Sequence, residues 1–183
     1  IRNCLLYYLS YSLNIEQSYM EKYTTLLDVT KIGLGTLLHL LDKAEAHCKE
    51  KGIPEEDLLT ASLAPDMFNF TRQIQIASDD ARRNLRLLAG KEHIKMEDTE
   101  KTITELRLRI SKTQDVVNEL TPADFEGADS RHISLYWMGE NFVEGKDLVA
   151  QLAIPNFIFH TTIAYAILRK EGVDIGKQDF ITG

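Results

Sequence analysis

A late apolar stretch of the sequence, LAIPNFIFHTTIAYAILRKEG at residues 152–172, carries two polar side chains that could do chemistry. Asn156 and His160 are four residues apart, so they lie one turn apart on the same face of an α-helix. Burying an unpaired amide or imidazole costs about 1–3 kcal/mol on mutational scales, so both groups need partners inside the protein. The rest of that face is apolar and consists of Val149, Ala153, Ala164 and Ile167.

Partners for these two side chains are expected on an earlier helix, the one that follows the sequence LAPDMF. Polar residues lie at the edge of its apolar face, with an aspartate further round. These residues are Thr71, Gln75, Ser78 and Asp79.

Three kinds of site fit this pattern. In the first, the polar side chains only satisfy one another and fix the register of the helices. In the second, Asn156, His160 and Gln75 line a small-molecule cavity inside a helical bundle. In the third, the same residues bind a divalent metal, zinc or nickel. Neutral amides are poor ligands for these metals, so the third site also needs His47 or Asp79.

The cavity hypothesis has two further supports in the sequence. Pro155 removes one backbone hydrogen bond from the helix and predicts a bend that opens space beside it. Tyr136 and Trp137 lie in the preceding connection and could cover the cavity as a lid. In an enzymatic version His160 is the general base, because a free imidazole titrates near neutral pH, and the two amides orient the substrate or stabilise an oxyanion.

Four long helices are needed to position these residues. Apolar residues recur every three or four positions over residues 25–51, 66–90, 97–120 and 145–170, which predicts four amphipathic helices. Between the third and the fourth, residues 132–143 contain β-forming residues around a glycine, which predicts a small hairpin. The pattern indicates an all-α four-helix bundle with a long third connection.

The third helix has one continuous apolar seam and a basic side. Its seam consists of Ile103, Leu106, Ile110, Thr113, Val117 and Leu120. On this pattern Arg107, Arg109 and Lys112 are expected on the solvent side.

Composition limits the partners of the protein. The chain has 183 residues, 44% of them hydrophobic, which suits one globular domain. A formal net charge of -7 argues against nucleic acid or an anionic membrane surface as a partner. No apolar run approaches the roughly 20 residues of a membrane span, and the two cysteines form no disulfide framework or zinc motif. A cytoplasmic location is therefore expected.

Three blocks of the sequence resemble a known group. LAPDMFNFTRQIQIASD, EDTEKT followed by EL, and IPNFIFHTTIAYAILRKEGVDIGKQDF are similar to an uncharacterised DUF family of the DinB/YfiT-like superfamily. The resemblance covers residue 20 to the C-terminus and implies a four-helix bundle with a long third connection. It also implies that residues 1–19 are an N-terminal extension and residues 20–183 a single DinB-like domain.

The wider superfamily holds a divalent metal with three histidines, one on the second helix and two spaced by four residues on the fourth. By this resemblance His160 takes the place of the last histidine, Asn156 that of its neighbour, and Gln75 that of the second-helix ligand. Only one histidine of three is kept, so the metal site implied here is degenerate. Superfamily members with the full triad include thiol-dependent transferases acting on small electrophiles.

These observations lead to one expected function and one alternative. The expected protein is a homodimer that binds a small molecule in a polar pocket within the bundle, with transferase-like chemistry as its enzymatic form. The alternative is a non-catalytic structural or interaction protein whose buried Asn, His and Gln side chains only fix helix packing.

Overall fold

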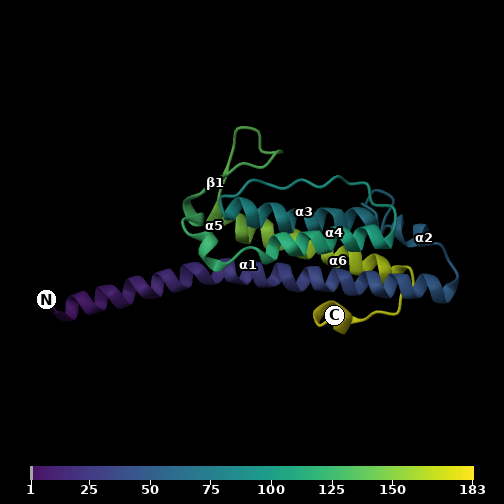
Figure 1. Ribbon diagram of the computed structural model, residues 1–183, viewed down its shortest axis with the longest axis horizontal. Coiled ribbons are helices and arrows are strands. Elements are labelled where there is room, and N and C mark those ends of the chain that lie inside the picture. Colours follow the sequence, from purple (N-terminus) through teal and green to yellow (C-terminus); the bar gives the residue numbers. More distant parts are fainter. Residues whose placement is uncertain (1) are drawn as a thin grey trace.

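The computed structural model describes residues 2–183, with side chains from Glu21 onward. Four long helices, α1 (Arg2–Lys51), α3 (Phe70–Leu88), α4 (Ile103–Asn118) and α6 (Ile154–Lys170), pack side by side (Figure 1). The all-α four-helix bundle expected from the sequence is confirmed. The extension expected at residues 1–19 lies outside the part of the chain whose side chains are described.

Short elements make the connections, including the expected hairpin between α4 and α6. Its two strands pair antiparallel, with His132 opposite Glu144 and Ile133 opposite Val143. The short elements are α2 (Glu55–Leu59), η1 (Pro122–Phe125), η2 (Ala128–Ser130), β1 (His132–Ile133), β2 (Val143–Glu144), α5 (Gly145–Leu148), η3 (Val149–Ala153) and α7 (Lys177–Ile181).

Two of the long helices begin later than the apolar periodicity predicts, and side-chain caps explain both starts. The side chain of Asn69 accepts a hydrogen bond of 2.9 Å from the backbone N–H of Arg72 at the start of α3. Thr102 and Glu105 form a capping box at the start of α4. A cap satisfies backbone donors that have no partner within the helix, so it sets the first residue more strictly than apolar spacing does.

Pro155 changes the helix that precedes α6 rather than ending it. The five residues of η3 form a π-helical turn, in which the N–H of Ile154 bonds to the carbonyl of Val149. Proline has no N–H and its ring collides with the carbonyl four residues earlier, so a wider turn directly before it relieves both problems. The disturbance predicted ahead of Asn156 therefore takes the form of a π turn.

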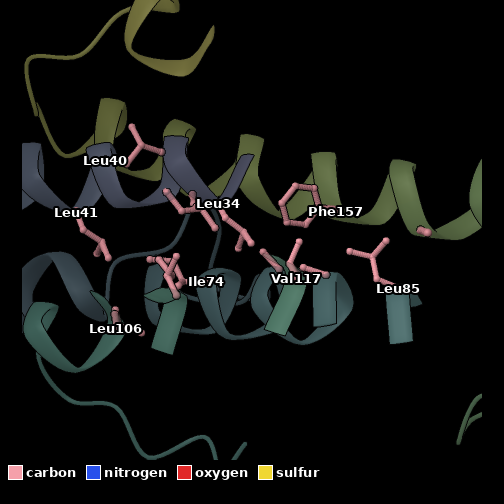
Figure 2. Close-up of a cluster of buried hydrophobic side chains, with 14 of the residues drawn as sticks. Leu34, Leu40, Leu41, Ile74, Leu85, Leu106, Val117 and Phe157 are labelled. Carbon is pink, nitrogen blue, oxygen red and sulfur yellow. The ribbon is translucent and has the colours of Figure 1, made fainter. Parts of the chain in front are cut away.

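The bundle surrounds a continuous apolar core to which all four long helices contribute. Figure 2 shows side chains from α1, α3, α4 and α6 meeting in its centre. The labelled members are Leu34, Leu40, Leu41, Ile74, Leu85, Leu106, Val117 and Phe157.

The segment Gly145–Lys170 is long and apolar enough to cross a membrane by length and composition. In the bundle its apolar side chains include Phe157, Ala164, Ile167 and Leu168, which are buried in the core. The core helix of a bundle can meet the same criteria of length and composition as a membrane span, so this segment is weak evidence for a membrane-spanning helix. The cytoplasmic location and the homodimer stay predictions.

Two glycines of α1 differ sharply in their surroundings. A Cβ atom on Gly33 would lie 2.4 Å from Cε1 of Phe157, whereas one on Gly35 would meet no atom within 4 Å. Phe157 is only 2% exposed, so moving its ring aside disturbs the packing between α1 and α6. Gly33 therefore allows α1 and α6 to approach closely.

We expect Gly33→Ala and Gly35→Ala to have opposite effects on the free energy of unfolding. Alanine is the better helix former by roughly 0.5–1 kcal/mol, and Gly35→Ala should raise stability by about that amount. Gly33→Ala should lower it by about 1–3 kcal/mol because the added methyl group overpacks the core. Urea denaturation of both variants tests this expectation. Equal changes in the two variants would contradict the close approach.

Candidate functional site

The face of α6 that carries Asn156 and His160 packs against α3, and the two helices run antiparallel (Figure 1). On α3 the facing stripe is polar as well. It includes Gln73 and Asp80, which are seven residues apart and are 2% exposed each. The two helices thus bury polar side chains against one another along their line of contact.

Asp80 is the centre of this polar contact. One of its carboxylate oxygens accepts a hydrogen bond from Nδ2 of Asn156, and the other pairs with the guanidinium of Arg83. A buried carboxylate is costly unless it is paired and hydrogen-bonded. Asn156 from α6 and Arg83 from α3 together meet that requirement. The half-buried Asn156 thus faces α3, as the sequence predicted.

His160 is held by an amide whose orientation is fixed from the other side. Nδ1 of His160 lies 2.7 Å from Oε1 of Gln73, and Nε2 of Gln73 donates a 3.0 Å hydrogen bond to the carbonyl of Phe68. Because the Gln73 nitrogen is engaged with that carbonyl, its oxygen must face the imidazole. Nδ1 of His160 therefore carries the proton, and Nε2 has the free lone pair.

The environment of His160 favours the neutral ring. Burial lowers the pKa of His160 below its ordinary value of 6.5, an effect opposed by the charge of Asp80 and reinforced by that of Arg72. Nε2 of His160 makes no hydrogen bond within the described residues. It is also not fully buried, because it is not among the described side-chain atoms that are both buried and without a partner. At neutral pH the ring thus offers an accessible lone pair, as a general base requires.

A cavity of about 510 Å³ opens beside this polar contact. Asn156 and Asp80 lie on its floor, together with Ile76 from α3. Trp137 and Tyr136, from the tip of the hairpin, form part of its wall and lie edge to face with ring centroids 4.7 Å apart. The structure therefore brings Asn156, Tyr136 and Trp137 to one cavity, whereas His160 and Gln75, which were expected to line it, lie outside it. His160 lies one helical turn beyond Asn156 and is not part of the lining.

The opposite wall of the cavity is the connection between α3 and α4, residues 91–102, which we call the strap. It has almost no regular secondary structure and follows α3 along the surface of the bundle (Figure 1). His93, Lys95, Met96 and Asp98 of the strap line the cavity. Without repetitive backbone hydrogen bonds of its own, the strap depends on side chains to hold it in place.

Two buried arginines supply that anchorage. Arg82 donates to the carbonyl of Ile94 at 2.6 Å, and Arg109 donates to the carbonyl of Glu97 at 3.0 Å. Both also donate to the same carboxylate oxygen of Asp79. Arg109 completes its hydrogen bonds and ion pairs with Ser78, Asp98 and Glu100.

Arg109 corrects the sequence analysis. It was expected on the solvent side of α4, but its side chain is only 1% exposed. Arg107, expected on the same side, does remain partly exposed at 31% and pairs with Asp42 and Glu45. The difference arises because acidic residues of α3 and the strap reach Arg109 across the bundle and compensate its burial.

Two further sequence predictions are wrong in position. Gln75 points away from α6: its amide donates to Glu100 at 2.9 Å and accepts from Arg72 at 3.3 Å. Gln73, two residues earlier and on the other face of α3, takes the place expected for Gln75.

His47 is also too far from His160 to share a site with it. It lies 11 residues beyond Thr36, the α1 residue that lines a groove together with Phe157 of α6. At 1.5 Å per residue it is about 16 Å further along the bundle and cannot join His160.

The metal site implied by the resemblance does not fit these residues. His160 is the only imidazole at the contact between α3 and α6, and Asn156 turns a donor, which cannot ligate a metal, toward Asp80. Within the described part of the chain, no three His, Cys, Asp or Glu side chains are grouped so that they could hold a metal ion. The ligand set for zinc or nickel is therefore incomplete.

Sequence reasoning missed the residues of α3 that matter most here. Gln73, Asp80 and Asn84 are polar residues at helical spacing, and that spacing was the available signal. They lie next to the apolar stripe that contacts the core, so they resemble the polar edge of an ordinary amphipathic helix. His93, which the sequence did not single out, also lines the cavity.

The comparisons with known proteins agree with this fold. A family model described as Domain of unknown function (DUF1993) matches residues 23–181. The chain belongs to the DUF1993 family. This DUF1993 chain is 35% identical to a DinB family member protein from Shewanella denitrificans, whose crystal structure was determined at 1.83 Å resolution. The likeness covers 90% of this chain and 96% of that chain, with a TM-score of 0.84.

The resemblance to an uncharacterised, DinB-like family is thus confirmed for this DUF1993 chain. No curated protein matches it. Its family and fold are therefore established by comparison, whereas its function has to be inferred from the site.

We expect the replacement of Arg109, which anchors the strap, to destabilise the protein more than the replacement of Arg107, which pairs at the surface of α4. Arg109→Met should lower the free energy of unfolding by about 1.5–3 kcal/mol, because it removes charged hydrogen bonds to Ser78, Glu97 and Glu100 in a partly buried network. Arg107→Met, the matched control, should cost about 1 kcal/mol or less. Chemical denaturation measures both values. The anchoring account fails if the two variants lose the same stability.

A second prediction concerns the protonation of His160. Its ¹⁵N chemical shifts at pH 7 should show a neutral ring protonated on Nδ1, and its midpoint should lie below 6.5, because burial disfavours the charged form. Since the folded-state pKa is lowered, the resulting stability is complete above pH 6.5 and falls as the pH drops below it. His160→Gln assigns the resonances. A midpoint above 6.5 or a proton on Nε2 would contradict the assigned tautomer.

Proposed function

We propose that this protein binds a small molecule in the cavity between α3, α6, the strap and the hairpin. The observation that carries the proposal is the buried Asp80, paired with Asn156 and Arg83, at the floor of a cavity of about 510 Å³. Small-molecule sites usually enclose about 300–1,000 Å³ and combine apolar walls with a few convergent polar groups. The aromatic hairpin tip and the polar floor match that description.

The alternative is a polar cluster that only fixes helix packing. Asn156 and His160 both have protein partners, as that alternative requires. A cluster with packing as its sole purpose would be enclosed by close-packed side chains, since protein interiors rarely leave space for more than a water molecule. The open cavity against Asn156, and the exposed Trp137 and Tyr136 beside it, favour ligand binding.

An enzymatic form of this function would use His160 only if the substrate extends from the cavity past Asn156 to the ring, which lies outside the cavity lining. The free lone pair on Nε2 and the lowered pKa of His160 suit a general base at neutral pH. Gln73 would be its positioning residue, because it holds the tautomer. The transferase chemistry of the wider superfamily stays a prediction, and no step of the binding function passes through a metal.

Filling the cavity should abolish ligand retention. Ile76→Trp places a large ring in the cavity from α3, whereas Ile32→Trp, the control, adds the same ring to the separate groove between α1 and α6. After dialysis against the small-molecule filtrate of its source cells, wild type and Ile32→Trp should retain a compound that Ile76→Trp does not. Mass spectrometry of the extracted protein detects it.

Two results would count against the proposal. One is retention of the same compound by Ile76→Trp, which would place binding elsewhere. The other is the absence of any enriched compound on wild-type protein, which would favour the packing alternative. Circular dichroism of both variants confirms that the comparison is made between folded proteins.

A further inference from the structure

We infer that the cavity is selective for an organic acid: a carboxylate bound by Arg83, on a flat apolar body that lies against Trp137. This inference rests on the proposed binding function and specifies the class of ligand.

The acidic side chains of the lining are already engaged. Asp79 accepts from Arg82 and Arg109, and Asp98 pairs with Arg72 and Arg109. Asp80 uses both of its oxygens, one for Asn156 and one for Arg83. Five of the six carboxylate oxygens therefore already accept at least one hydrogen bond or ion pair from the protein. A cationic or donor-rich ligand therefore finds few unoccupied acceptors.

Arg83 has donors to spare. A guanidinium has five N–H groups, and in the described structure Arg83 uses only Nη2, in its pair with Asp80. Its Nε is a buried donor without a partner, one of three buried side-chain atoms without a partner among the described residues. A ligand in the cavity reaches Arg83 through Nη1 instead, which makes no hydrogen bond among the described residues and is not one of their fully buried atoms, so an acceptor would gain a charge-assisted hydrogen bond there. A carboxylate fits best, since its two oxygens match two donors of the guanidinium fork.

An aromatic surface lies directly beside these donors. The guanidinium of Arg83 is 5.1 Å from the ring centroid of Trp137, within the range of a cation–π contact. Trp137 is 49% exposed and lines the cavity. An exposed aromatic ring next to a charged anchor favours a ligand with a planar apolar portion attached to its acidic group.

The electrostatic surroundings agree with an anionic ligand. The chain carries a net charge of -7, yet the lining has three basic residues for its three acidic ones. At the strap, the pKa of His93 is lowered by burial and then by the positive charges of Arg82, Arg83 and Arg86. With equal numbers of basic and acidic side chains, the lining repels an acid less than the net-negative surface elsewhere does.

The single tryptophan makes the inference directly measurable. Phenylacetate, phenylacetamide and phenethylamine share one apolar body and differ in the charge of the end group. Each is titrated into wild-type protein while the fluorescence of Trp137 and its quenching by acrylamide are recorded. We expect phenylacetate to shield Trp137 and to bind about tenfold or more tightly than the amide, as a charge-assisted hydrogen bond implies. Phenethylamine should bind most weakly.

Two variants locate the carboxylate. Arg83→Gln should remove the preference for phenylacetate over phenylacetamide, while Arg86→Gln, three residues along α3 and outside the lining, should keep it. Arg83→Lys retains the charge that Asp80 needs and should bind phenylacetate with a smaller preference, because an ammonium lacks the fork. It keeps the test valid if Arg83→Gln does not fold.

The outcomes separate this inference from the binding function. Equal affinity for the three probes, or the highest affinity for phenethylamine, overturns the selectivity for acids but leaves binding in the cavity intact. No response of Trp137 to any probe also overturns the inference. The proposed function is then decided by its own test, which is whether wild type and Ile32→Trp retain a compound. An unchanged preference in the folded Arg83 variants assigns the carboxylate to another residue and overturns the inference as well.

Discussion

A buried carboxylate on α3 must be compensated, and this requirement organises the site. Asp80 is held by Asn156 across the helix contact and by Arg83 on its own helix. Hydrogen bonds to charged groups contribute about 1.5–3 kcal/mol each. If one partner is removed, the desolvation penalty of the buried carboxylate is no longer compensated. The pairing therefore fixes the register of α3 against α6. The same register brings Gln73 level with His160 and fixes the tautomer of the ring.

The arginines that follow one another along α3 divide two tasks between them. Arg82 faces inward and, with Arg109 of α4, shares Asp79 and binds backbone carbonyls of the strap. Arg83 faces the cavity and contacts Trp137 of the hairpin. Both walls of the cavity are thus tied to α3, although neither wall belongs to a long helix. Charge pairing across the bundle, rather than apolar packing, sets the shape of the opening.

The sequence predicted the parts of the fold that depend on periodicity and missed those that depend on long-range charge. Apolar spacing identified the four helices and the inward face of Asn156 and His160, because a period of 3.6 residues is a local property. The choice between Gln73 and Gln75 was not local: both flank Ile74, and only the direction of α6 decides which one faces it. Arg109 was misplaced for the same reason, since its acidic partners Asp79, Asp98 and Glu100 come from other segments. The strap has no periodicity from which its course could be predicted.

The presence of an amide at position 156 changes what this part of the bundle can do. The DinB-like resemblance implies a metal ligand there, and a ligand must direct a lone pair at the ion. Asn156 directs an N–H at Asp80 instead, and the positive charge next to that carboxylate is the guanidinium of Arg83. A guanidinium is permanently charged and covalently attached, so it provides a fixed anion-binding group where a metal would provide an exchangeable Lewis acid. On the binding function proposed above, the geometry of hydrogen bonding then determines which molecules the cavity accepts, and His160 lies beyond the cavity lining.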